Sequence, residues 1–228
     1  MLPSVRDLAL FLAPLVVTAI GMVLVSAGLG DRILPKGVLE IGERSGLGIA
    51  VGLAICGQAG FLLAAGGRLR APVILVLALV GAAGSVSWLH ASVTTTRKKG
   101  VWSLLALLGA STLLFVACYP PLAFDELVYH LPIAESLARH GALTFQPELR
   151  VPAFPLLGEA IQAELRIFGG DAATHFASWC ALIATATLLY AWAAARGGSF
   201  AGAVAAALPA SKPAIHQPRG DSPSRSTA

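Results

Sequence analysis

Charged residues are scarce in this sequence of 228 residues: only 12% are Asp, Glu, Lys or Arg, whereas 56% are hydrophobic. Soluble globular domains carry roughly a quarter charged residues, and the mean hydropathy of this chain is +0.76. Charged residues at this frequency are too few to cover the surface of a domain that folds in water. The composition therefore excludes an ordinary water-soluble protein.

Cysteine is also rare, with only Cys56, Cys118 and Cys180. Their number is odd, no CxxC pair occurs and all three lie inside apolar segments, which excludes a disulfide framework and a zinc site of familiar spacing. We expect these cysteines to behave as small hydrophobic side chains.

The basic residues do not form a patch. The formal net charge is +4 and the sequence pI is about 9.3, but the Lys and Arg residues are scattered among loops. The interleaved aromatic residues of a nucleic-acid surface are missing. Nucleic acid is therefore excluded as a partner, and the basic residues are interpreted as topology signals.

Long apolar segments dominate what is present. A helix of about 20 apolar residues crosses a bilayer, because all of its backbone hydrogen bonds are made within the helix. Segments of this kind lie at 8–29, 46–66, 71–90, 101–119 and 172–195. The first exceeds the apolar core of a signal peptide, about 7–15 residues, so we expect it to be retained. The sequence predicts an all-α, polytopic transmembrane protein.

The remaining organisation follows from these segments. Residues 1–119 hold four predicted membrane helices, 120–171 form a polar loop, and 172–210 hold a fifth helix and the start of a sixth. Residues 211–228 are rich in Pro and Ser, which predicts disorder. Because this composition begins abruptly within an apolar run, we expect a truncation or a frameshift, with a genuine tail as the alternative.

The loop opens with the stretch FDELVYHLPIAESLARHG at 124–141, in which an acidic pair directly follows the fourth apolar segment. Pro132 suits the first turn of a helix, and Gly141 suits the position just after its end. The stretch PLLGEAIQAELRIFGG at 155–170 again begins with Pro and ends in Gly. Both carry apolar residues at helical spacing, so we expect two amphipathic helices on the membrane surface.

The acidic pair, Asp125 and Glu126, has two interpretations. The two carboxylates can simply solvate the end of the fourth membrane helix. Alternatively, a carboxylate held between two membrane-anchored elements is partly desolvated and can take a proton from a hydroxyl group as a general base. The residues alone leave both interpretations open.

Together with the sequence that follows, this stretch resembles the first extracytoplasmic loop of the GT-C glycosyltransferases. The resemblance is to bacterial membrane enzymes of the dolichyl-phosphate-mannose-protein mannosyltransferase-like (family 39-like) group, and it covers about residues 119–195. The matching positions are Asp125, Glu126, Tyr129, His130, Pro132, Gly141, Pro152, Pro155 and Gly158.

The resemblance implies transfer of a sugar from a polyprenyl-phosphate donor to an acceptor hydroxyl at the outer face of the plasma membrane, with inversion. Asp125 would deprotonate the acceptor, and Glu126 would position the acceptor or a divalent cation. No compact ligand spacing points to a metal site, so no metal ligands are assigned. Membrane lipid and the lipid-linked sugar are the implied partners, and the oligomeric state stays open.

Tyr129 and His130 are candidate substrate-binding residues because they lie in the matched motif. The alternatives are a membrane-interface anchor for Tyr129 and backbone hydrogen bonds for His130 and for His140. The donor phosphate would need a cation, for which a guanidinium is well suited. The Arg residues of the loop are Arg139, Arg150 and Arg166, and each of them has an ordinary ion pair as its alternative role.

Two departures from the family matter. Four apolar segments precede the acidic loop instead of one, and the many later membrane helices of the family have no counterpart. We therefore expect an N-terminal fragment that keeps the catalytic acid but is inactive alone. The alternative is a small non-enzymatic membrane protein, a scaffold or an assembly partner.

The orientation in the membrane follows from the positions of Lys and Arg, which collect on the cytoplasmic side. The loop 30–45, the RKK run at 97–99 and Arg196 are predicted inside, which puts 120–171 outside. The basic turn at 66–70 then also faces outward, against the general trend.

This orientation can be tested with reporter fusions. A reporter fused near residue 145 should be active outside the cytoplasm, and one fused at residue 98 should be active inside. The reverse pattern would remove the acidic pair from the side on which this family acts.

Overall fold

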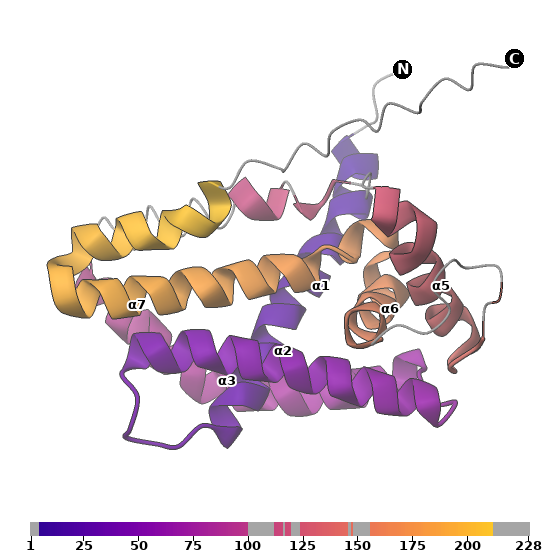
Figure 1. Ribbon diagram of the computed structural model, residues 1–228, viewed down its shortest axis with the longest axis horizontal. Helices are drawn as coiled ribbons and strands as arrows, with labels where there is room; N and C mark the ends of the chain where they lie inside the picture. Colours follow the sequence, from indigo (N-terminus) through magenta and orange to yellow (C-terminus); the bar gives the residue numbers. More distant parts are fainter. Residues whose placement is uncertain are drawn as a thin grey trace, which may run out of the picture.

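The computed structural model describes residues 5–99, 112–115, 117–119, 124–145, 147 and 156–211. The predicted fourth helix at 101–119 and the predicted tail at 211–228 lie largely outside these residues. Within the described residues every regular element is helical, so the predicted all-α fold is confirmed (Figure 1).

Among the described residues, four long helices form the body of the molecule. They are α1 (Val5–Ile33), α2 (Ile41–Ala65), α3 (Ala71–Lys99) and α7 (Phe176–Ala207). Among the described residues, the stretches long and apolar enough to cross a membrane are Ala9–Ile33, Ile41–Ala65 and Asp171–Ala207. The apolar part of α3 is shorter, Ala71–Val86. The chain is therefore a helical membrane protein.

Shorter elements form the loop that was predicted to hold two amphipathic helices. They are the π-helix η1 (Glu126–His130), α5 (Leu131–His140), α6 (Leu157–Gly169) and the 3-10 turn η2 (Asp171–Ala173); a last turn, η3 (Leu208–Ser211), follows α7. Pro132 lies in the first turn of α5, and Gly141 ends α5 with a left-handed φ of 65°, as the sequence predicts.

The turn between α2 and α3 lies at the same end of the molecule as this loop. The Leu69 N–H donates to the Gly141 carbonyl oxygen at 3.0 Å, and the Leu143 N–H donates to the Ala64 carbonyl oxygen at 3.0 Å. The basic turn 66–70 and the acidic loop therefore share one end, as the expected topology requires. The side of the membrane that this end faces stays a prediction.

The chain reverses direction inside α7 at Gly198, whose φ of 79° is left-handed and suits glycine. Figure 1 shows the yellow end of the helix running back along its orange part. Gly202 allows this close return, because a methyl group there would lie 2.9 Å from both the Tyr190 carbonyl oxygen and the Ala194 Cβ. The predicted start of a sixth helix at 198–210 thus folds back on α7.

The connection between α1 and α2 is fixed by one guanidinium. Arg44 lies 2.5 Å from an Asp31 carboxylate oxygen and donates to the carbonyl oxygens of Asp31 and Pro35, both at 2.8 Å, and of Leu34 at 3.3 Å. The last carbonyl groups of a helix have no partner within the helix. Arg44 satisfies one of them, that of Asp31, and two carbonyl groups just after α1, and thereby holds the start of α2 against the end of α1.

Glycine lets α1 and α2 approach so closely that their backbones touch. A methyl group at Gly52 would overlap the Ser26 carbonyl oxygen, and one at Gly30 would overlap the Gly48 carbonyl oxygen. Small residues allow this kind of packing between membrane helices, where lipid supplies no hydrophobic driving force for association. The α1–α2 contact therefore depends on the absence of side chains at these positions.

The other faces of α2 use glycine in the same way. A methyl group at Gly46 would lie 2.9 Å from the Ala184 carbonyl oxygen of α7. One at Gly57 would lie 3.1 Å from the Leu157 carbonyl oxygen of α6. α2 is therefore the helix against which α1, α6 and α7 all pack.

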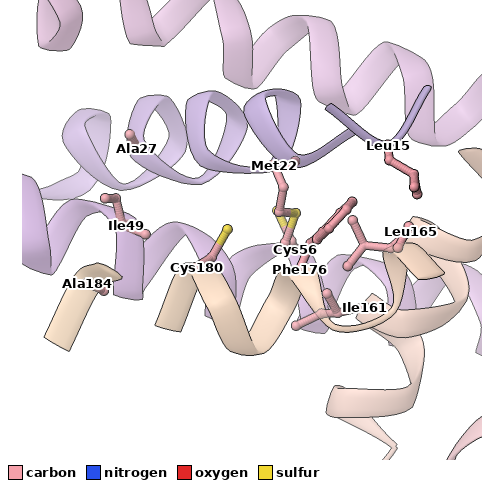
Figure 2. Packing of buried hydrophobic residues seen from close by; sticks show 12 residues of the cluster. Leu15, Met22, Ala27, Ile49, Cys56, Ile161, Leu165, Phe176, Cys180 and Ala184 are labelled. Atoms are coloured by element: carbon pink, nitrogen blue, oxygen red, sulfur yellow. The ribbon is translucent and has the colours of Figure 1, made fainter. Parts of the chain in front are cut away.

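Apolar side chains fill the space between these helices. The main cluster joins α1, α2, α6 and α7 around Phe176 and Leu15, which are 0% and 2% exposed. Figure 2 shows Cys56 and Cys180 inside it, as expected for small buried side chains. A second cluster joins α5 and α6 to the ends of α2 and α3 through Ala64, Leu69, Ile74, Ile133, Ala134, Leu137 and Ala163.

The α1–α2 contact predicts that two glycines respond differently to the same change. Gly52→Ala should destabilise the protein by about 1–3 kcal/mol, the usual cost of extra atoms in a packed interior, because its methyl group would meet backbone. Gly21→Ala is the matched control, since nothing lies within 4 Å of its added methyl group. Thermal unfolding in detergent micelles measures both, and equal melting temperatures would contradict the close contact.

Candidate functional site

The acidic pair lies where the chain enters η1. Asp125 is exposed, and one of its carboxylate oxygens accepts a hydrogen bond from the Glu126 N–H at 3.2 Å. The wide turn of η1 has a local cause in Pro132, which has no N–H to donate and whose ring crowds the carbonyl group four residues earlier. The Leu131 N–H donates five residues back, to the Glu126 carbonyl oxygen. Such π-turns are frequent at functional sites.

Glu126 is directed toward the start of α7. Its Oε1 lies 3.2 Å from Nε2 of His175, the residue just before α7. The Glu126 and His175 side chains are 29% and 23% exposed, so this contact is half-buried. It joins the start of η1 to the start of α7, and it leaves Asp125 as the more exposed of the two acids.

His130 meets a second carboxylate at the other end of η1. Its Nδ1 lies 2.6 Å from Oε1 of Glu159, whose side chain is 4% exposed in the first turn of α6. This contact with a side chain forms because α6 packs against α5 and buries a carboxylate beside the ring. His140 does follow the expectation, with Nδ1 2.9 Å from the Ser136 carbonyl oxygen.

Tyr129 packs within the protein. Its ring centroid lies 4.8 Å from that of His130, with the two rings inclined at 56°, and its side chain contacts the second apolar cluster. This position leaves the Tyr129 ring beside His130 rather than beside Asp125.

The described arginines of the loop form ion pairs, and they differ in their exposure to solvent. Arg166 lies 2.6 Å from Asp171 and 3.4 Å from Glu135. Arg139 also pairs with Glu135 but is 74% exposed. Arg150 lies outside the described residues. Of the candidates for the donor phosphate, Arg139 is thus the most accessible in the part of the chain that the structure describes.

Asp171 does not cap α7 with its side chain. Its carboxylate pairs with Arg166 and its backbone carbonyl oxygen accepts from the Thr174 hydroxyl at 2.7 Å. η2 separates Asp171 from the first residue of α7, so Asp171 belongs to the connection between α6 and α7.

A metal centre does not form among the described residues. No three His, Cys, Asp or Glu side chains converge there on a point that could hold an ion. Glu126 and His130 each face a different partner, His175 and Glu159. The divalent cation that the family resemblance implies therefore stays an expectation without a ligand set.

Sequence reasoning missed Glu159 and His175, the partners that hold η1 in place. Glu159 lies in the first turn of α6, where an acid is favoured by the helix dipole and would ordinarily be expected to face water. The only signal for His175 is its position at the edge of a long apolar segment. Neither spacing predicts a partner 29 or 49 residues away in the chain.

No family model matches the chain, and neither a curated protein nor a solved structure matches it. The class is therefore defined by the fold and the composition: an all-helical membrane protein with a histidine–carboxylate site at one end. Within this site, Asp125 offers an exposed carboxylate that can accept a proton. The half-buried Glu126–His175 pair beside it can accept and donate hydrogen bonds.

The His130–Glu159 contact predicts that two histidines of the same loop differ in importance. His130→Ala would leave the buried Glu159 carboxylate without this partner, at a cost of about 1–3 kcal/mol. Backbone amides of 126–137 should then exchange hydrogen faster, as measured by mass spectrometry. His140→Ala is the matched control because His140 is exposed. Similar exchange in both variants would show that the contact does not hold η1.

Proposed function

We propose that this protein is a membrane glycosyltransferase, or the N-terminal part of one, acting at the outer face of the plasma membrane. It transfers a sugar from a polyprenyl-phosphate donor to an acceptor hydroxyl. The proposal begins from the resemblance of about residues 119–195 to the first extracytoplasmic loop of the GT-C glycosyltransferases. Its physical support comes from the way in which the described residues of this loop are held.

The observation that carries the proposal is the contrast between the two acids. Asp125 is exposed and accepts a local hydrogen bond from the Glu126 N–H, whereas Glu126 is half-buried against His175. A general base must reach its substrate and lie within hydrogen-bond distance of the proton that it removes. Asp125 satisfies the first requirement, and the anchored η1 fixes its position at the end of the helices.

The other groups have supporting roles in this proposal. Glu126 and His175 orient the acceptor hydroxyl beside Asp125. Arg139, exposed on the last turn of α5, contacts the departing lipid phosphate as an always-charged guanidinium. Tyr129 and His130 support η1 by packing and by the contact with Glu159 rather than by touching the sugar.

Replacing the base tests this proposal. Asp125→Asn keeps the size of the side chain but removes its ability to accept a proton at neutral pH. Sugar transfer from a radiolabelled polyprenyl-phosphate sugar should fall by about 10²–10⁴-fold, the usual contribution of a general base. The assay uses membranes in which the native gene product carries the substitution, and immunoblotting checks that its amount is unchanged.

Asp171→Asn is the matched control, because it is the same substitution at the same end of the molecule. Its carboxylate is 59% exposed and pairs with Arg166, a type of contact worth about 0–1 kcal/mol, so transfer should stay near the normal rate. Normal transfer by Asp125→Asn would refute the assignment of the base. A wild-type protein that transfers no lipid-linked sugar would favour the non-enzymatic scaffold.

A further inference from the structure

A cavity of about 290 Å³ lies between α1, α2, α3 and α6, and it shares no residue with the acidic site. Its walls are almost entirely apolar. α1 contributes Val17, Val25 and Leu29, and α3 contributes Leu75, Ala78 and Val80. Among the described residues that line the cavity, Glu164 is the only one with a charged side chain.

Glu164 reaches the cavity from α6 and is 9% exposed. Gly60 of α2 leaves space for its carboxyl group, since a methyl group there would lie 2.5 Å from Oε1. Within the described part of the chain, no hydrogen bond or ion pair engages this carboxyl group. A buried polar group without a partner is costly, so this arrangement favours a ligand that supplies one.

The protonation state of the Glu164 carboxyl group decides whether a ligand must accept or donate the hydrogen bond. Burial raises the pKa of Glu164 to about 8, so near neutral pH most of the carboxyl groups carry a proton. A protonated carboxyl group has one O–H donor. The other polar side chain of note, Thr18, already donates its hydroxyl to the Pro14 carbonyl oxygen at 2.7 Å. The cavity thus offers one donor among hydrocarbon walls.

The lining of the cavity, which is called the channel below, follows α1. Its lining runs from Val17 to Leu29, twelve residue steps that span about 18 Å at the helical rise of about 1.5 Å per residue. One leaflet of a bilayer is about 15 Å deep, half of the roughly 30 Å hydrocarbon core. The lining on α1 is therefore about as long as one acyl chain, and Glu164 of α6 lies opposite Gly60 of α2.

The rim of the channel opens on lipid-facing surface. Val17 of α1 is 69% exposed, and Leu75 and Val80 of α3 are 50% and 48% exposed. In a helical membrane protein such apolar surface contacts acyl chains, so a lipid can enter directly from the bilayer. Gly60, which marks the depth of Glu164, lies five residues before the end of α2, near the polar boundary where the ester groups of lipids lie.

We infer that this channel binds one acyl chain of a glycerolipid from the bilayer, and that Glu164 donates a hydrogen bond to the ester carbonyl oxygen of that chain. The inference does not depend on the proposed sugar transfer, because it uses none of the residues of the acidic site. Its ligand is defined by two features, a long hydrocarbon chain and a carbonyl acceptor at the head of that chain.

Photocrosslinking in bilayers tests the channel. The protein is reconstituted with phosphatidylcholine that carries a diazirine in one acyl chain, illuminated and digested for mass spectrometry. Labelling should concentrate on α1 residues 17–29 and on α3 residues 74–80. Ala78→Trp should fill the channel and reduce this labelling at least tenfold. Leu79→Trp is the matched control, because Leu79 is 61% exposed and is absent from the lining.

Two further comparisons test the hydrogen bond. Glu164→Gln keeps a donor and should label like the wild type, whereas Glu164→Leu should label about fivefold less, the ratio that one net hydrogen bond contributes. The diazirine lipid with an ether in place of the ester lacks the carbonyl group and should show the same loss with the wild type alone.

Three results would overturn the inference. Equal labelling of Ala78→Trp and Leu79→Trp would show that lipid contacts the outer surface only. Equal labelling by the ester and ether lipids would show that Glu164 does not recognise the carbonyl group. No labelling of the residues that line the channel would show that no acyl chain of the bilayer occupies it. Circular dichroism of each variant confirms that it is folded.

Discussion

The structure depends on glycines of α2, which let the backbones of the neighbouring helices come into direct contact with it. In lipid, an apolar side chain gains little free energy by moving from contact with acyl chains to contact with another helix. Membrane helices therefore associate through close packing and hydrogen bonds. Gly52 against Ser26, and Gly48 against Gly30, bring α1 and α2 together without side chains between them. The large fraction of exposed apolar surface elsewhere is compatible with this arrangement, because that surface faces lipid.

The positions of the acidic site and of the apolar cavity both depend on how α6 packs on α2. α6 packs on α2 at Gly57 and Gly60, and this packing buries two acids that differ in their surroundings. Glu159 is paired with His130 and anchors the loop of the acidic pair. Glu164 faces the apolar cavity between α1 and α3. The short helix α6 thus holds η1 through Glu159 and places the buried Glu164 carboxyl group at the apolar cavity.

Much of the architecture could be predicted from composition and period. Runs of about 20 apolar residues cannot expose their backbone to lipid and must be helices, which accounts for α1, α2 and α7. Pro132 and Gly141 likewise fix the ends of α5 through their own backbone limits. The reversal at Gly198 could not be predicted in the same way, because a glycine within an apolar run is compatible both with a continuous helix and with a turn.

The sequence by itself determined the helical class, the membrane environment and the acidic pair as the polar feature of interest, because these follow from local backbone and solvation physics. The tertiary structure alone decided which groups meet. His130 met the Glu159 carboxylate, and Glu126 met His175, because α6 and α7 pack beside η1. Such pairings join residues distant in the chain, and no local pattern encodes the packing that brings them together.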